Sequence, residues 1–288
     1  MTATAKTKRP DRVVATPAEC RDAILDAIRG ATRQLSLSLF RCNDPEIFEE
    51  LAAARTRGVA VDALVTARAA GSAKKLKKLR EKLLDADATV HIYADPVVKY
   101  HAKYLVADDG PAIVASLNFT KKCFSRTLDA LVITYDPAVV SGLREVMAAD
   151  CGLQPTLASL APRLIVGPER ARAQIAALLG GARSSIRLLD AKLSDPAFVA
   201  LLAERRAAGV RVEVLDGKRY GDLKSHGKVC LIDDRVAVVG GLALAAMSLD
   251  FRREVAIVVD APEAMADVRR FLDGVTVASA SAGAAASV

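Results

Sequence analysis

Two of the three histidines in the chain have the same neighbours. His101 and His226 are each followed by a lysine two positions later, Lys103 and Lys228, and by an aspartate seven positions later. An imidazole can act as nucleophile, acid or base near neutral pH, because its unperturbed pKa lies near 6.5. A neighbouring ammonium can offset negative charge on a reacting phosphoryl group. The repeated pattern H-x-K-x4-D therefore predicts a site at which two histidines act on a phosphoester.

Strand periodicity predicts how these side chains are presented. Alternate residues of a strand face the same side, so strands over 100–107 and 226–232 would each present the histidine beside its lysine. Ser116 and Asn118 would share a face of a following strand over 113–118 and could donate hydrogen bonds to an anion. These residues together predict a phosphate-binding pocket.

An internal repeat places the second pattern. An offset of 151 relates seven identities in the first part of each half, and beyond Gly58 the offset is 125, so the first half carries 151 − 125 = 26 extra residues. The shorter offset pairs His101 with His226 and Asp129 with Glu254. The identities at the longer offset are Pro17/Pro168, Ile24/Ile175, Gly30/Gly181, Ala31/Ala182, Asp44/Asp195, Pro45/Pro196 and Gly58/Gly209.

Each half alternates predicted helices and strands, which is typical of an α/β domain. In the first half we expect helices over 18–30 and 45–57 and strands over 34–40, 59–65, 100–107 and 113–118. In the second we expect helices over 170–180 and 196–208 and strands over 185–189, 210–215, 226–232 and 236–242.

The repeat also predicts the division of the chain. We expect a disordered basic tail over 1–12, two halves over 13–150 and 164–277, a linker over 151–163 and a disordered tail over 278–288. The longest apolar stretch, 236–247, is shorter than the roughly 20 residues of a membrane-spanning helix, and no apolar segment follows the basic start as in a signal peptide.

Composition limits the partners. A formal net charge of +7 with a pI near 9.2 favours anionic partners. The five cysteines are widely spaced and form no C-x-x-C pair, so we expect neither a disulfide framework nor a zinc site, and a cytoplasmic location.

The two patterns resemble the hallmark of the phospholipase D superfamily, in which a duplicated H-x-K-x4-D precedes G-S-x-N and an acidic residue. Ala115-Ser116-Leu117-Asn118 and Asp129 match the later parts in the first half. The resemblance implies two α/β/α-layered halves about a pseudo-twofold, with the site at their seam and complete in a monomer. It also implies a phosphohistidine intermediate without a metal or other cofactor.

The resemblance assigns roles to the remaining residues. Asp129 and Glu254 would orient the histidines, Lys103 and Lys228 would bind the phosphate with Ser116 and Asn118, and the motif aspartates Asp108 and Asp233 would brace turns.

The second half departs from the family pattern. Gly240-Gly241-Leu242-Ala243 stands where G-S-x-N is expected, so two donors are missing, at about 1–3 kcal/mol each if nothing replaces them. The first half retains more of the phosphate cradle. We therefore expect His101 to be the nucleophile and His226 the general acid.

The substrate is open between three interpretations. The first is a phospholipid headgroup, by hydrolysis or transfer, with peripheral membrane association. The second is DNA or RNA, and the third is non-catalytic binding of either. The extra segment contains a basic amphipathic helix, Lys74–Lys82, that would contact a membrane or nucleic acid, or simply cover the first sheet with its leucines Leu76, Leu79, Leu83 and Leu84 inside. We expect His91, which has no lysine two positions on, to be structural.

Overall fold

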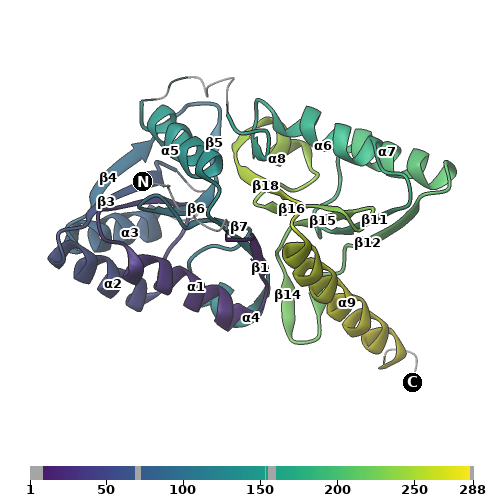
Figure 1. Cartoon of the computed structure of the whole chain (residues 1–288), viewed down its shortest axis with the longest axis horizontal. Coiled ribbons are helices and arrows are strands. Elements are labelled where there is room, and N and C mark those ends of the chain that lie inside the picture. Colours follow the sequence, from purple (N-terminus) through teal and green to yellow (C-terminus); the bar gives the residue numbers. More distant parts are fainter. Residues whose placement is uncertain (1–8, 69–72, 153, 155–159, 286–288) are drawn as a thin grey trace, which may run out of the picture.

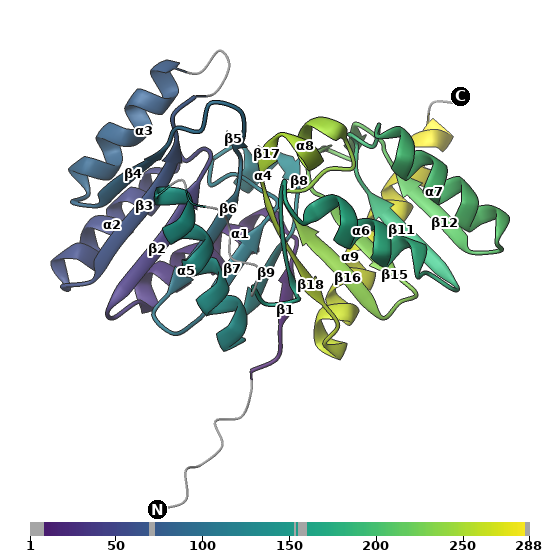
Figure 2. The same cartoon turned by 90° about the horizontal axis from the view of Figure 1, so that it is seen from above.

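Two β-sheets lie side by side, one from each half of the chain (Figure 1; Figure 2). This computed structural model describes residues 9–68, 73–152, 154 and 160–285, and side chains as far as residue 279. The first sheet has the strand order β1-β9-β7-β6-β2-β3-β4, and the second has the order β10-β18-β16-β15-β11-β12. Without β4 the two orders correspond strand for strand, as a duplicated chain would produce.

The bounds of the strands are as follows. In the first sheet they are β1 (Arg12–Val14), β2 (Gln34–Leu39), β3 (Ala60–Thr66), β4 (Thr89–Tyr93), β6 (Lys103–Ala107), β7 (Ala112–Ala115) and β9 (Leu131–Thr134). In the second they are β10 (Leu164–Val166), β11 (Ser185–Leu189), β12 (Arg211–Leu215), β15 (Val229–Ile232), β16 (Val236–Gly240) and β18 (Val255–Val259). Short strands form two small sheets: β5 (Lys99–Tyr100) with β17 (Arg252–Arg253), and β13 (Arg219–Tyr220) with β14 (Leu223–Ser225) and β8 (Thr127–Leu128).

Helices cover both faces of each sheet. Figure 1 shows α1 (Pro17–Gly30) and α2 (Pro45–Thr56) on the side of the first sheet opposite to α5 (Pro137–Cys151). It also shows α6 (Ala171–Gly180) and α7 (Pro196–Ala207) on the side of the second sheet opposite to α9 (Pro262–Ala285). The remaining helices are α3 (Ala73–Asp85), α4 (Cys123–Arg126) and α8 (Ala246–Asp250). The expected α/β fold with layers on each sheet is thus observed.

The same local devices start equivalent helices in the two halves. Asp44 and Asp195 cap α2 and α7 by accepting backbone N–H groups of the first turn, and a proline follows each cap. Arg21 and Arg172 each bind the capping carboxylate through two nitrogens at distances of 2.8–3.1 Å. The repeat therefore extends to polar contacts that fix the helix ends.

The two sheets share a hydrophobic core. Side chains such as Val114 and Val132 of the first sheet belong to the same buried cluster as Val239 and Ile257 of the second. The outer faces of the sheets have separate cores beneath their own helices. The shared core fixes the position of one half relative to the other.

Four predicted strands depart from their expected bounds by two residues or more. The strand expected over 100–107 is interrupted at residues 101–102, and the one expected over 226–232 begins only at residue 229. The strands expected over 113–118 and 236–242 end at Ala115 and Gly240. Near the site the backbone leaves the sheets, because the amide of His101 donates to Arg253 of the other half rather than to a sheet neighbour.

The chain ends also differ from expectation. β1 includes Arg12, and α9 continues to Ala285, past the boundary expected at residue 277. The remainder of the expected tails, residues 1–8 and 286–288, lies outside the described residues, as do residues 153 and 155–159 of the expected linker.

In α3, Leu76, Leu79 and Leu83 are buried as expected, whereas Leu84 is exposed. The buried leucines follow the i, i+3, i+7 spacing of one helix face, and Leu84 lies off that face.

Candidate active site

The His101 side of the site is built from both halves of the chain. β5 pairs in parallel with β17, and the amide of His101 then donates to the carbonyl of Arg253 at 2.9 Å. This pairing brings Nδ1 of His101 to 2.8 Å from Oε1 of Glu254, whose side chain is fully buried. Glu254 therefore orients a histidine that belongs to the other half.

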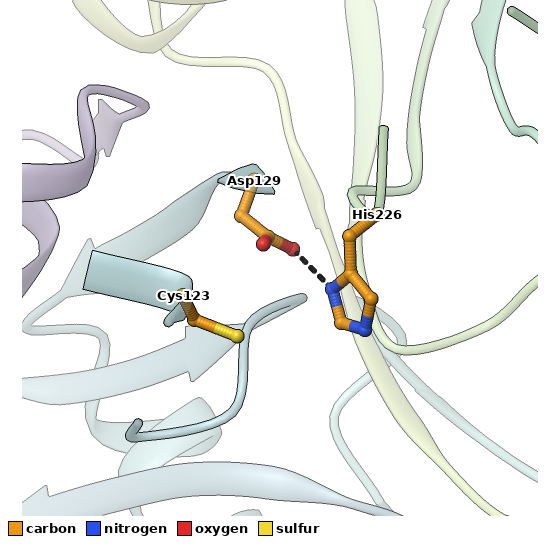
Figure 3. A group of neighbouring side chains, drawn as sticks. All are labelled: Cys123, Asp129 and His226. Carbon is orange, nitrogen blue, oxygen red and sulfur yellow. Dashed lines mark hydrogen bonds and ion pairs between the residues drawn. The ribbon is translucent and has the colours of Figure 1, made fainter. Parts of the chain in front are cut away.

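The His226 side is built by the reciprocal exchange. β14 pairs in parallel with β8, and the amide of His226 donates to the carbonyl of Leu128 at 3.2 Å. Nδ1 of His226 lies 2.8 Å from Oδ1 of Asp129 (Figure 3). Each histidine thus depends on a carboxylate from the opposite half, which puts the assembled site at the seam.

The carboxylate of Asp129 is fully hydrogen-bonded. Its Oδ1 also accepts from the hydroxyl of Ser116 at 2.7 Å, and its Oδ2 accepts from the hydroxyl of Thr127 at 2.6 Å. Ser116 in turn accepts from the amide of Ala130 at 3.0 Å. The proton of Ser116 is therefore already donated, which conflicts with the expectation that this hydroxyl binds a phosphate.

The carboxylate of Glu254 is supported differently. The hydroxyl of Ser248, in α8, lies 3.1 Å from its Oε1 and accepts from the amide of Ala243 at 3.0 Å. Arg252 Nη1 lies 3.9 Å from the same oxygen, and Oε2 has no hydrogen-bond partner among the described residues. A Cβ atom at Gly241 would lie only 2.3 Å from Oε2, so this carboxylate occupies the space of the missing motif serine.

The protonation of His101 follows from its surroundings. Burial, together with the positive charges of Lys103 and Arg252, lowers the pKa of His101 to about 3 against the opposing effect of Glu254. The ring is therefore neutral, and Nδ1 carries the proton that it donates to Glu254. Nε2 is left with a lone pair, as a nucleophile requires.

Lys103 Nζ lies 2.9 Å from the same Nδ1, but an ammonium has no lone pair to accept that proton, so its hydrogen bond goes to the His101 carbonyl.

Both motif lysines are buried beside the histidines. Burial lowers the pKa of Lys103 to about 8, so the ammonium still predominates at neutral pH. Lys228 donates to the carbonyl of His226, as Lys103 does to that of His101. Burial would raise the pKa of Glu254, but His101 and Lys103 offset it and the net direction is downward. The result is a pair of buried cations beside ionised carboxylates.

Asn118 lines a groove that also contains His226, and its amide oxygen has no partner among the described residues. The ring of Phe40 packs against that of His101, with centroids 4.3 Å apart, and lines the same groove. The groove holds about 680 Å³. The groove therefore reaches His226 directly, and it reaches the ring that packs against His101.

Comparison with known proteins finds a family model for part of the chain. The sequence profile described as "Cardiolipin synthase, PLD-like domain" matches residues 24–151. The first half of the chain therefore contains a phospholipase D-like domain. No curated protein matches the sequence.

Solved structures of the superfamily share the fold over nearly the whole chain. Phosphatidylserine synthase of Haemophilus influenzae superposes with a TM-score of 0.75 at 12% identity, covering 92% of this chain and 85% of the other. Polyphosphate kinase of Porphyromonas gingivalis superposes with a TM-score of 0.74 at 17% identity, covering 92% of this chain and 47% of the kinase. This chain therefore spans about half the length of that kinase.

The two motif aspartates of the superfamily pattern lie away from the histidines. Asp108 accepts hydrogen bonds from the amides of residues 32–34, and Asp233 accepts them from the amides of residues 183–185. Although burial opposes it, these donors lower the pKa of each carboxyl to about 2. Both carboxylates brace the approach to the second strand of their own half, β2 for Asp108 and β11 for Asp233.

One group of side chains near His226 has the donor types of a metal site. Ligand atoms of Cys123, Asp129 and His226 lie within 4.8 Å of one another (Figure 3). Zinc takes four protein ligands in a structural site, or three and a water in a catalytic one, so the number of donors alone fits a catalytic zinc site. Asp129 already accepts hydrogen bonds from Ser116, Thr127 and His226. The group therefore fits an orienting network better than a metal centre.

Sequence reasoning missed four residues that touch the site. Ser248 lies outside the repeat offset, so no pattern pointed to it. Thr127 and Arg252 occupy equivalent positions at the offset of 125, two residues before each carboxylate, and that pairing could have identified them. Phe40 carried no distinguishing signal. His91, expected to be structural, binds Asp62 at 3.0 Å.

Among the described helices, none is long and apolar enough to cross a membrane.

Proposed function

We propose that this chain breaks or exchanges phosphodiester bonds through a covalent phosphohistidine on His101. One observation carries the proposal: both imidazoles donate Nδ1–H to a buried carboxylate, with a buried lysine beside each. This arrangement leaves both Nε2 atoms for chemistry and surrounds them with positive charge. The phospholipase D-like domain over residues 24–151 supports an enzyme that handles phosphodiesters.

In the first step, Nε2 of His101 attacks phosphorus and a nitrogen–phosphorus bond forms. The bond from phosphorus to the leaving oxygen breaks, and that oxygen takes the Nε2 proton of His226. Lys103 and Lys228 stabilise the charge that develops on the phosphoryl oxygens. His101 suits the nucleophilic role because its ring is neutral at working pH.

In the second step, the now neutral His226 removes a proton from water or an acceptor alcohol. The resulting oxygen attacks phosphorus, and the nitrogen–phosphorus bond breaks to restore His101. Water gives hydrolysis and an alcohol gives transfer. Both outcomes use the same intermediate, and neither step requires a metal.

Two substrates fit this chemistry. A nucleic acid strand is favoured by the basic lining of the groove beside His226. A phospholipid headgroup is favoured by exposed apolar side chains, Val97 and Phe251, next to the β5–β17 pair that holds His101. The structural neighbours are a phosphatidylserine synthase and a polyphosphate kinase, so they support phosphoryl chemistry in general.

The proposal is tested by paired assays in EDTA, with bis(p-nitrophenyl) phosphate, a labelled oligonucleotide and phosphatidylcholine vesicles as substrates. We expect cleavage of the small diester and of one natural substrate, and loss of both in His101→Ala. A slow substrate quenched in alkali, where phosphohistidine survives, should leave on the peptide that contains His101 the mass of the phosphoryl group with its remaining ester substituent.

Full activity in His101→Ala, or phosphate found on His226 alone, would contradict the assignment. Oligonucleotide binding without cleavage of any diester would instead support a non-catalytic binder.

A further inference from the structure

The groove beside His226 is lined by positive charge. Its lining includes six lysines and no carboxylate among the described residues. Lys75, Lys78 and Lys82 come from α3, Lys121 and Lys122 from the loop before α4, and Lys224 from β14. A single phosphate held by Lys103 and Lys228 needs none of these six. They form a second, separate set of cations, here called the lysine track.

Three lysines of α3 face the groove because of their spacing along the helix. Lys75, Lys78 and Lys82 follow the i, i+3, i+7 spacing of one face, and Lys82 lies 5.3 Å from the ring centroid of Phe48. Lys74 and Lys77 belong to the same helix but do not line the groove, and Lys77 pairs with Glu81 at 3.8 Å. The sequence run of lysines is therefore divided into a groove face and a solvent face.

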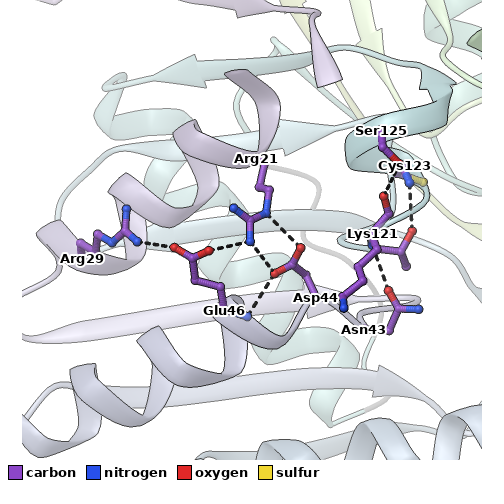
Figure 4. A network of polar contacts seen from close by, with 9 residues as sticks. Arg21, Arg29, Asn43, Asp44, Glu46, Lys121, Cys123 and Ser125 are labelled. Atoms are coloured by element: carbon purple, nitrogen blue, oxygen red, sulfur yellow. Dashed lines mark hydrogen bonds and ion pairs between the residues drawn. The ribbon is translucent and has the colours of Figure 1, made fainter. Parts of the chain in front are cut away.

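The loop that carries Lys121 and Lys122 is held in place. The amide of Lys121 donates to the side chain of Asn43 at 3.0 Å, and the carbonyl of Lys121 accepts from Ser125 at 2.8 Å (Figure 4). Asn43 is adjacent to the cap of α2, which Arg21 binds. The backbone that carries these two lysines is thus positioned before any ligand arrives, which lowers the entropic cost of binding.

We infer that the lysine track binds the phosphates of a single-stranded nucleic acid that flank the one at the histidines. A strand repeats its phosphates along a backbone that a groove can follow, and six cations from three elements match several phosphates. A zwitterionic headgroup has one phosphate, so it would leave most of the six lysines without an anionic partner. Phe40 also lines the groove and is an aromatic ring of the kind that bases stack against. The inference rests on the proposed function, since it specifies the substrate of that site.

The test compares two variants with equal charge changes on one helix. Lys75→Glu with Lys78→Glu reverses two charges of the track, and Lys74→Glu with Lys77→Glu reverses two on the solvent face. Both are made in a His101→Ala background, so that binding is measured without cleavage. The probe is a fluorescein-labelled single-stranded oligonucleotide titrated at several salt concentrations, with circular dichroism to verify folding.

We expect the track variant to lose roughly tenfold or more in affinity and to show a salt slope reduced by about one to two, since each phosphate contact contributes about 0.7 on a single strand. The solvent-face variant should stay within about threefold of its parent. Equal losses in both variants, or no binding by the parent, would overturn the inference.

Binding of the parent to anionic vesicles, lost only in the track variant while the oligonucleotide is ignored, would assign the track to lipid and also overturn it. Failure of the proposed function is seen separately. A wild-type protein that cleaves no diester but binds the strand through the track would refute the mechanism alone.

Discussion

The two histidines are held by the same contact, but the contact is supported by different means. Asp129, behind His226, accepts from Ser116 and Thr127 and has both oxygens satisfied. Glu254, behind His101, accepts from Ser248, and its second oxygen lies over Gly241. In both cases a hydroxyl group donates a hydrogen bond to the carboxylate that orients the histidine. The residue that supplies this hydroxyl does not occupy the same place in the motif. Glutamate is one methylene longer than aspartate, and it fills the space that a motif serine leaves.

The largest effect is expected from the carboxylates themselves. Asp129→Asn and Glu254→Gln keep the shape but present a donor to Nδ1, which favours the wrong tautomer, so each should lower kcat by roughly 10²–10⁴-fold. Rapid quench would separate the steps. Glu254→Gln should slow phosphoenzyme formation most, because Glu254 supports the nucleophile. Asp62→Asn, which alters the pair with His91, is the control and should retain activity.

The lowered pKa of His101 predicts a dependence of stability on pH. Below about pH 6.5 the unfolded chain protonates this histidine while the folded chain does not, so the free energy of unfolding falls as pH falls. Between pH 7 and 5 this accounts for about 2 kcal/mol. Denaturant titrations of His101→Gln should show that much less acid sensitivity than wild type.

His91→Gln removes a histidine outside the site and serves as the control for that experiment. Equal acid sensitivity in wild type and His101→Gln would show that the His101 ring is charged in the folded state.

Restoring the motif serine at residue 241 should lower both stability and kcat. In Gly241→Ser the new Cβ would lie 2.3 Å from Oε2 of Glu254, so the carboxylate must move away from His101. Overpacking of this kind costs about 1–3 kcal/mol in stability, and kcat should fall as well. Gly274→Ser, where nothing lies within 4 Å, is the matched control. A gain in activity from Gly241→Ser would contradict this, because it would mean that the His101 side works better with the motif serine than with the present arrangement.

The smallest effect tests the equivalence of the two serines. Ser116→Ala and Ser248→Ala each remove one donor to a carboxylate, at about 1 kcal/mol or roughly fivefold in kcat. Ser141→Ala, which removes an exposed contact with Glu145, should be neutral. Unchanged kcat in Ser248→Ala, alongside a loss in Ser116→Ala, would break the proposed equivalence.

The sequence predicted the phospholipase D-like domain and the α/β fold, because motif spacing, the repeat and apolar periodicity can all be read along the chain. It also singled out His101, His226 and their lysines by type and spacing. It did not predict that both histidines lie just outside sheet strands, since their amides bind carbonyls more than 90 residues away. Ser248 escaped notice because α8 brings it to Glu254 only in three dimensions. The sequence likewise did not show which lysines of α3 line the groove, because this depends on how the buried leucines orient the helix against the sheet.

The exchange of short parallel strands, β5 with β17 and β14 with β8, makes each histidine depend on the seam between the halves. If the seam opens, His101 loses Glu254 and His226 loses Asp129. Neither half by itself contains the carboxylate that orients its own histidine.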